Sequence, residues 1–215
     1  MLVRRALLTR LGISVLGAAA GVQSARAQSS SATAAGGDIA QALTPYRLGM
    51  IRPALLARAK AALGRPEIRR TDRLAVVDLA MPSRTPRLFL IDLHAGAVES
   101  FLVAHGKGSD PDHTGVASRF GDEPGSNMTP LGAFAGAERY QGKHGLSLRL
   151  DGLDPANANA RARAIVLHSE WYVSEVMART HGKLGRSNGC FVVDEAVLPR
   201  VLTAIDGGGL LYADA

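Results

Sequence analysis

The sequence of 215 residues contains a single cysteine and no uninterrupted apolar stretch of membrane-spanning length. One cysteine cannot form an internal disulfide, which excludes disulfide-stapled small folds and cysteine-rich zinc folds. A permanent membrane span needs about 18 or more consecutive apolar residues. The hydrophobic fraction of 47% in turn excludes a wholly disordered chain. The length therefore indicates one domain, with at most a short appendage.

Acidic residues are absent from the first 37 positions. A basic start that includes the Arg4-Arg5 pair precedes an apolar stretch at 11–22 and the small-residue triplet ARA at 25–27. This order is typical of a signal peptide, so we predict that residues 1–27 are removed and that the protein is exported, to the periplasm or the cell wall. An amphipathic helix is the alternative. The arginine pair is also compatible with twin-arginine export, beside the general secretory route.

The basic charge of the chain lies partly in this leader. The formal net charge is +6, from 25 basic and 19 acidic residues. Residues 1–27 contain four arginines and no acid, so the mature chain has 21 basic against 19 acidic residues, or +2. No Lys/Arg-rich run with interleaved aromatics remains. We therefore predict no nucleic-acid partner and no stable membrane span after cleavage.

The mature chain begins with two segments that differ in composition. Residues 28–37 are small and polar, which predicts a flexible linker. In the segment 38–70, apolar side chains recur at three- and four-residue spacing as far as about residue 63, with breaks at Pro45 and Pro53. This pattern predicts an N-terminal helical segment made of two short helices.

From about residue 70 onward, short apolar or alternating runs are typical of strands. Between them, residues 106–127 are rich in Gly, Ser, Asp and Pro without periodicity, and a loop of that length in a compact domain is usually functional or disordered. Helices are predicted at 171–179 and 195–205. The fold class is therefore predicted to be mostly β with a few short helices. Strands are predicted at 73–81, 87–94, 97–105, 147–150, 164–168, 189–193 and 210–212.

Cys190 lies between a polar turn and an apolar, strand-like run. A buried structural role is the commonest one for a free cysteine. The preceding residues 186–189 are polar and partly cationic, however, which is unlike a core position. An unpaired thiol in an exported protein is also open to oxidation. We therefore predict that Cys190 is a nucleophile, with the structural role as the alternative.

A nucleophilic thiol needs a base or a positive neighbour, because an ordinary cysteine is mostly protonated at neutral pH. His168 ends the apolar run 164–168. A strand that ends in His beside a strand that begins with Cys brings imidazole to thiol. His168 is thus predicted to act as general base and then to protonate the leaving amine. A solvent-exposed histidine at a strand end is the alternative.

The turn before the cysteine offers donors for an oxyanion. Backbone N–H groups of Asn188, Gly189 and Cys190 are available, and glycine permits close approach to a substrate carbonyl. Arg186 and Lys183 either bind a substrate carboxylate and favour the thiolate or are solvated surface charges. There is no H-E-x-x-H, no H-x-H and no cysteine pair. We therefore predict no metal and no cofactor, with a dispersed His/Asp site as the alternative.

Five segments follow one another in a specific order along the chain. They are VAHGKGSD at 103–110, GSNMTPLGAF at 125–134, YQGKHGLSLRL at 140–150, RAIVLHSEWYVS at 163–174 and GRSNGC at 185–190. Each is weak alone. The ordered set of Thr-Pro-x-Gly-x-Phe, a strand-end His and Ser-x-Gly-Cys resembles the L,D-transpeptidase (YkuD-like) catalytic domain, in the branch of murein L,D-transpeptidase catalytic domain family proteins.

The resemblance implies a mostly β, sandwich-like catalytic domain over residues 71–215. It implies that Cys190 is the acyl-accepting nucleophile, His168 the general base, and the carbonyl of Ser169 the group that orients the imidazole. The implied reaction is acyl transfer between peptidoglycan stem peptides. The thiol attacks the carbonyl of an L-centre and expels the following D-residue, and an amine of a neighbouring stem then resolves the thioester into a cross-link. Further implied substrate contacts are His105, Tyr140, His144 and Thr129.

Two positions depart from the commoner family pattern. The residue directly before Gly-Cys is Asn188 instead of His, and the residue two after the cysteine is Val192 instead of a polar one. A backbone N–H at 188 does not need histidine, whereas Val192 removes the usual contact to a substrate carboxylate.

Other functions use the same residues. Water in place of the amine would give an L,D-carboxypeptidase or amidase, which trims stems or releases wall-attached proteins. A non-catalytic wall-binding domain is a third function class. NlpC/P60-type peptidases place Cys before His, and sortases need a Thr-Leu-x-Thr-Cys turn and a later strand Arg, so both are disfavoured.

Overall fold

A computed structural model of the protein describes residues 49–215. The predicted signal peptide, the predicted linker and the start of the predicted helical segment lie outside the described residues. Within the described part, no helix is both long and apolar enough to cross a membrane. The helices are α2 Pro53–Ala62, α3 Glu175–His181 and α4 Leu198–Ile205, with a 3-10 turn η1 at Pro155–Asn157.

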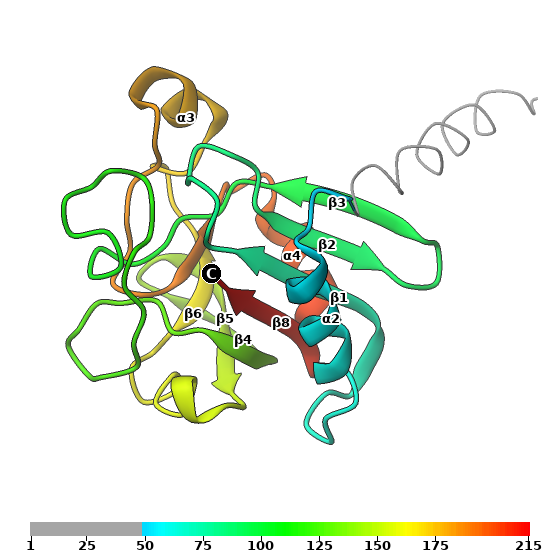
Figure 1. Ribbon diagram of the computed structural model, residues 1–215. Coiled ribbons are helices and arrows are strands. Elements are labelled where there is room, and N and C mark those ends of the chain that lie inside the picture. Colours follow the sequence, from blue (N-terminus) through cyan, green and yellow to red (C-terminus); the bar gives the residue numbers. More distant parts are fainter. Residues whose placement is uncertain (1–48) are drawn as a thin grey trace, which may run out of the picture.

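The described residues form one eight-stranded sheet (Figure 1). The strands are β1 Arg70–Asp78, β2 Leu88–Asp92, β3 Ala97–Phe101, β4 Gly132–Gly142, β5 Gly145–Gly152, β6 Val166–Ser169, β7 Phe191–Val193 and β8 Gly209–Asp214. Their order is β3-β2-β1-β8-β4-β5-β6-β7. The β1–β8 and β6–β7 pairs are parallel and the other pairs antiparallel. The predicted mostly β fold class with a few short helices is confirmed.

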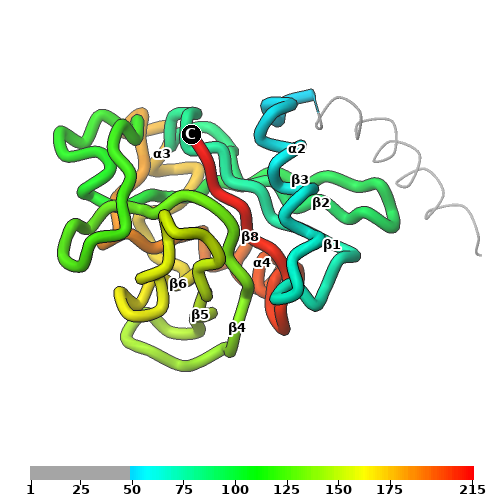
Figure 2. The backbone as a smooth tube through the Cα atoms, turned by 60° about the horizontal axis from the view of Figure 1, so that its bottom comes forward, coloured from blue at the N-terminus to red at the C-terminus, as the bar shows by residue number. Residues whose placement is uncertain are grey.

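The sheet curls so strongly that one sheet supplies both walls of the main core. Neighbouring strands lie about 4.8 Å apart, so a flat sheet would hold β4 and β7 about 14 Å from each other. Yet the rings of Phe134 on β4 and Phe191 on β7 meet edge to face, with centroids 5.5 Å apart. In Figure 2 the two halves of the sheet lie on either side of β8. The curl explains the predicted sandwich-like character without a second sheet.

Alternation along β1 sends its side chains to two different helices. Ala75 and Val77 belong to the main core with α4. Leu74 and Val76 belong to a second core with α2. Because successive strand residues point to opposite faces, the continuous apolar run of β1 is buried on both sides. The helices therefore cover opposite faces of β1 and β8 (Figure 1).

Strand β4 was not predicted from the sequence, because its first half is built of alanine and glycine, which have low strand propensity. Packing explains the small residues. A Cβ at Gly136 would lie 1.8 Å from the carbonyl oxygen of Ile205 at the end of α4. The N–H of Gly208 donates to the Gly136 carbonyl at 2.8 Å. A larger residue would push the loop after α4 off the sheet.

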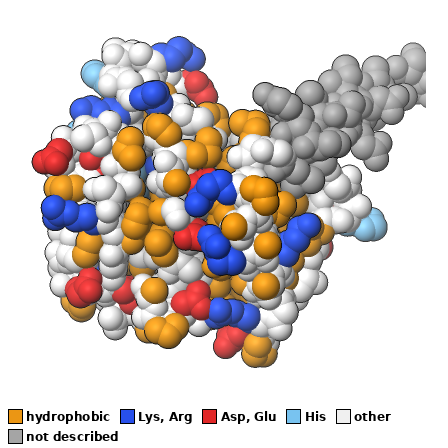
Figure 3. Space-filling view, in the orientation of Figure 1, with side chains coloured by type: hydrophobic (Ala, Val, Ile, Leu, Met, Phe, Trp, Pro, Cys, Tyr) orange, Lys and Arg blue, Asp and Glu red, His pale blue; other side chains and the backbone are white. Residues whose placement is uncertain are grey.

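Helix α2 lies inside the predicted helical segment 38–70, and residues 63–69 of that segment are turn and loop before β1. It starts with Pro53, which suits a first turn, and buries Leu55, Ala59 and Ala62. Arginines at its ends and outer side pair with aspartates of the sheet region, and Figure 3 shows cationic and acidic side chains next to one another on this face. The Arg58–Asp214 and Arg65–Asp154 pairs are partly exposed and contribute little each. Arg52 pairs with the buried Asp78 and compensates its charge, so apolar burial is the main attachment.

We expect Leu55→Ala to lower the free energy of unfolding by about 2–5 kcal/mol, because the side chain is fully buried between helix and sheet. Urea unfolding followed by circular dichroism measures it. The exposed Lys60→Ala on the same helix is the control and should stay within about 0.5 kcal/mol of the parent. A loss below 1 kcal/mol for Leu55→Ala would mean that α2 is only loosely attached to the sheet.

Candidate active site

The parallel pair of β6 and β7 positions the thiol and the imidazole. Leu167 pairs with Phe191, and His168 with Val192. Leu167 and Phe191 both lie in the main core. Because side chains alternate along a strand, His168 and Cys190 project to the other side of the pair. Two short apolar runs thus place their polar residues on a common face.

The two side chains line one pocket of about 540 Å³. Six of the residues predicted from the sequence contribute to it: Cys190, His168, Asn188, Arg186, Tyr140 and His144. Residues far apart in the chain are therefore brought together as the ordered motifs implied. Lys183, His105 and Thr129 are not among the residues that line the pocket.

The thiol of Cys190 points toward an unusual bend of the chain. Its Sγ donates a hydrogen bond to the carbonyl oxygen of Ala164 at 3.5 Å. Ala164 has a φ of 53°, in the left-handed region that non-glycine residues rarely occupy. Among the described residues no hydrogen bond joins the thiol to His168. In this resting state the sulfur shares the pocket with the imidazole and holds a backbone acceptor instead.

Burial raises the pKa of the Cys190 thiol above its ordinary value. A hydrogen bond from the N–H of Val166 and the positive charges of Arg163 and Lys143 act in the opposite direction without cancelling it. The resting sulfur is therefore a neutral thiol that becomes a nucleophile only when a base removes its proton.

His168 is held in the tautomer that a base requires. Its side chain is 2% exposed, and its Nδ1 lies 3.1 Å from the carbonyl oxygen of Ser169. A carbonyl accepts only, so Nδ1 carries the proton and Nε2 keeps a lone pair. Burial lowers the pKa of the imidazole, although the Ser169 carbonyl raises it in part. The ring is thus neutral at pH 7.

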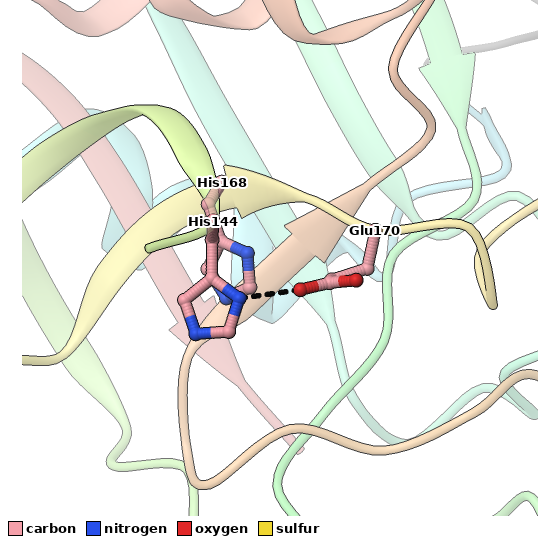
Figure 4. A group of neighbouring side chains, drawn as sticks. All are labelled: His144, His168 and Glu170. Atoms are coloured by element: carbon pink, nitrogen blue, oxygen red, sulfur yellow. Dashed lines mark hydrogen bonds and ion pairs between the residues drawn. The ribbon is translucent and has the colours of Figure 1, made fainter. Parts of the chain in front are cut away.

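A second imidazole lies against the first. The rings of His144 and His168 are stacked with centroids 4.3 Å apart, and His144 Nδ1 contacts a carboxylate oxygen of Glu170 (Figure 4). One ligand atom from each of the three residues lies within 4.8 Å of the others, a spacing that suits a cation. A cation there would take the Nε2 lone pair of His168, since Nδ1 is engaged. His168 therefore could not bind a metal ion and act as a base at the same time, because both need the lone pair on Nε2.

The turn before Cys190 is pinned by the hydroxyl of Ser187. This hydroxyl donates to the carbonyl of Cys190 at 2.7 Å and accepts the N–H of Gly189 at 3.0 Å. Gly189 has a φ of 118°, which favours glycine. The predicted trio of oxyanion donors is therefore reduced, because the N–H of Gly189 is already engaged. Among the described residues no hydrogen bond engages the N–H of Asn188, and the N–H of Cys190 interacts with the thiol of the same residue.

The long segment 106–127 is anchored beside the site by the two predicted cations. Lys183 Nζ donates to the carbonyl of His113 at 2.6 Å, and Arg186 donates to the carbonyls of Asp110 and Pro111. Figure 1 shows the segment on the same side of the sheet as α3. Lys183 thus holds the loop, whereas Arg186 holds it and also lines the pocket.

His105 and Thr129 are buried behind the pocket. His105 is 1% exposed, its Nδ1 accepts from Arg87 at 2.7 Å, and burial lowers its pKa to about 4. The hydroxyl of Thr129 accepts the N–H of Gly106 at 2.8 Å. A Cβ at Gly106 would lie 2.7 Å from the Cα of Gly189. These residues set the backbone on which the Cys190 turn rests, and they are not accessible to a substrate.

Sequence reasoning missed four residues with ionisable side chains that line the pocket: Lys143, Arg163, Glu170 and Tyr172. All four lie inside the segments that carry the family resemblance, which was the signal available. Arg163 donates to the carbonyl of Met128 at 2.7 Å, so it links the pocket to the Thr-Pro loop.

Fold and site together define a β protein with a cysteine and a histidine in one pocket. The sequence profile of the L,D-transpeptidase catalytic domain matches residues 50–213. The chain therefore belongs to the L,D-transpeptidase catalytic domain family. No curated protein matches it.

Solved structures similar to this chain include an L,D-transpeptidase from Mycobacterium smegmatis, with 12% identity, 67% of this chain and 59% of that chain covered, and a TM-score of 0.40. Bd1075 from Bdellovibrio bacteriovorus has 16% identity, coverages of 66% and 47%, and a TM-score of 0.39. A variant of the helical cell shape determining protein Pgp2 from Campylobacter jejuni has 11% identity, coverages of 73% and 53%, and a TM-score of 0.42. The chain spans roughly half to three fifths of the length of these proteins.

We expect alkylation of Cys190 by iodoacetamide to rise with pH and to have its midpoint above that of an ordinary exposed cysteine, because burial raises the thiol pKa. Lys143→Gln should move the midpoint higher still, since the ammonium favours the thiolate. Mass spectrometry of timed samples gives the rates, with Lys60→Gln on α2 as the control. A midpoint below pH 7 would mean that the free protein already holds a thiolate–imidazolium pair.

Proposed function

We propose that this protein is an exported cysteine acyltransferase that cross-links peptidoglycan stem peptides, an L,D-transpeptidase. One observation carries the proposal. In a chain of the L,D-transpeptidase catalytic domain family, the only thiol shares a pocket with an imidazole whose Nδ1 is held by a backbone carbonyl. The neutral resting forms of both groups suit general-base activation of Cys190 by His168.

The first half-reaction forms a thioester. Substrate entry exchanges the Ala164 contact of the thiol for His168 Nε2, which takes the proton as sulfur attacks the carbonyl of an L-centre. The N–H groups of Asn188 and Cys190 stabilise the oxyanion. Collapse breaks the C–N bond, and the imidazolium protonates the leaving amine of the D-residue. The Ser169 carbonyl stabilises the imidazolium through Nδ1.

The second half-reaction decides the product. Attack by an amine of a neighbouring stem forms the cross-link, whereas attack by water shortens the stem. Stem peptides carry several carboxylates, and Arg186 and Lys143 at the pocket provide positive charge for them. Asn188 contributes only its backbone N–H here, so its replacement of histidine does not remove a donor.

Export is part of the proposal, because peptidoglycan lies outside the cytoplasm. It is supported by the basic, apolar and small-residue order of positions 1–27. Residues 71–215 are proposed as the catalytic unit, preceded by the linker and the helical segment.

The decisive assay incubates the purified protein with muropeptides and analyses the products by mass spectrometry. Dimers are expected with the parent protein, and Cys190→Ala should lose at least a thousandfold in rate, since it lacks the nucleophile. Shortened stems without dimers would establish the hydrolase instead. Identical products with and without the protein would leave a wall-binding role.

We also expect a carbapenem to acylate Cys190, because a reactive thiol attacks the strained β-lactam carbonyl. Intact mass should increase by one inhibitor molecule. His168→Gln should slow adduct formation about a hundredfold or more through loss of the base, with its circular dichroism spectrum unchanged. No adduct on the parent, while a denatured sample still reacts with iodoacetamide, would argue against an open active site.

A further inference from the structure

A second pocket of about 830 Å³ adjoins the one that contains Cys190. The two pockets have three lining residues in common: Lys143, His144 and Glu170. The His144–Glu170 pair thus stands at the junction, open to both sides. A reaction that joins two stem peptides needs two places for substrate, and the junction is where they meet.

The pockets differ in charge. Beside Cys190 the lining includes Lys143, Arg163 and Arg186 and a single carboxylate, Glu170. The second pocket has Lys143 as its only Lys or Arg and adds the carboxylates of Asp194 and Glu195. A cationic wall suits the carboxylates and the developing oxyanion of a donor, whereas an acidic wall suits an incoming ammonium.

The acceptor amine must lose two protons during the reaction, and each proton needs an acceptor group. An amine side chain has a pKa near that of lysine, about 10.4, and arrives as an ammonium at pH 7. Conversion of the ammonium into an amide nitrogen releases two protons. His168 passes one of them to the departing thiolate of Cys190. The other must leave before attack, because an ammonium has no lone pair, and it requires a different acceptor.

We propose that the second pocket binds the acceptor stem through its side-chain ammonium and that the His144–Glu170 pair accepts the first proton. This inference rests on the proposed transpeptidase function. Glu170 holds His144 through Nδ1, which leaves Nε2 as the acceptor. The neutral amine then attacks the thioester carbon, so a C–N bond forms and the C–S bond breaks with its electron pair on sulfur. His168 takes the second proton and returns it to the sulfur.

Contacts around the pair support this role. The stack of His144 on His168 places the two proton acceptors side by side (Figure 4). His144 is only partly buried, so a substrate amine can reach its side chain. Trp171, 78% exposed, stands at the second pocket and provides an apolar surface beside the charged junction.

The test compares two acceptors on one acyl-enzyme. Parent and Glu170→Gln proteins are first acylated with a donor muropeptide. Each acyl-enzyme is then mixed with a lysine-type amine or with hydroxylamine, which is already neutral at pH 7. The rate at which the Cys190 adduct disappears is measured by intact-mass spectrometry. In Glu170→Gln the rate ratio of ammonium acceptor to hydroxylamine should fall about a hundredfold. His144→Gln should lower the same ratio. A merely structural defect would slow both acceptors alike.

Glu175→Gln is the matched control, because this exposed glutamate on α3 pairs with Arg179 and does not line either pocket. Its ratio should equal that of the parent. An acyl-enzyme with an unchanged ratio in Glu170→Gln would overturn this inference and leave the proposed function standing. Failure to form any Cys190 adduct in the parent would overturn both.

Discussion

The parallel pairing of β6 with β7 is the constraint on which the site depends. Its register puts Leu167 and Phe191 into the core and leaves His168 and Cys190 on the other face. A slip of one residue would exchange these sets and bury the polar pair. The strong curl of the sheet brings Phe134 against Phe191 in the core. This contact holds Phe191, and with it the register of β7, in place, so the packing of the core also positions Cys190.

Burial then determines the charge state of the site. It raises the pKa of the thiol and lowers that of the imidazole, so both are neutral at rest. A neutral thiol resists oxidation better than a thiolate would. The Ala164 carbonyl, turned inward by a strained bend, holds the resting thiol. In the proposed reaction, the sulfur must leave that carbonyl before His168 can take its proton.

Local signals in the sequence predicted strands where apolar runs are continuous, as in β1 and β2. They failed for β4, because its glycine and alanine residues are required by the close packing of α4 against this strand. The proposed roles of Cys190 and His168 rest on the ordered motifs, and the contact of His168 with the Ser169 carbonyl lies where the resemblance implied it. The roles of His105 and Thr129 did not, because burial by Arg87 and Gly106 is a tertiary property. Engagement of the Gly189 N–H by Ser187 is likewise invisible in the sequence.

The second imidazole of the pocket, that of His144, does not come from the turn before Cys190. The residue before Gly189 is an exposed turn position, and Asn188 there contributes backbone only. The ring stacked on His168 comes instead from the β4–β5 turn, between Gly142 and Gly145. Because Glu170 follows the β6 strand directly, base and second imidazole are both held by one strand end.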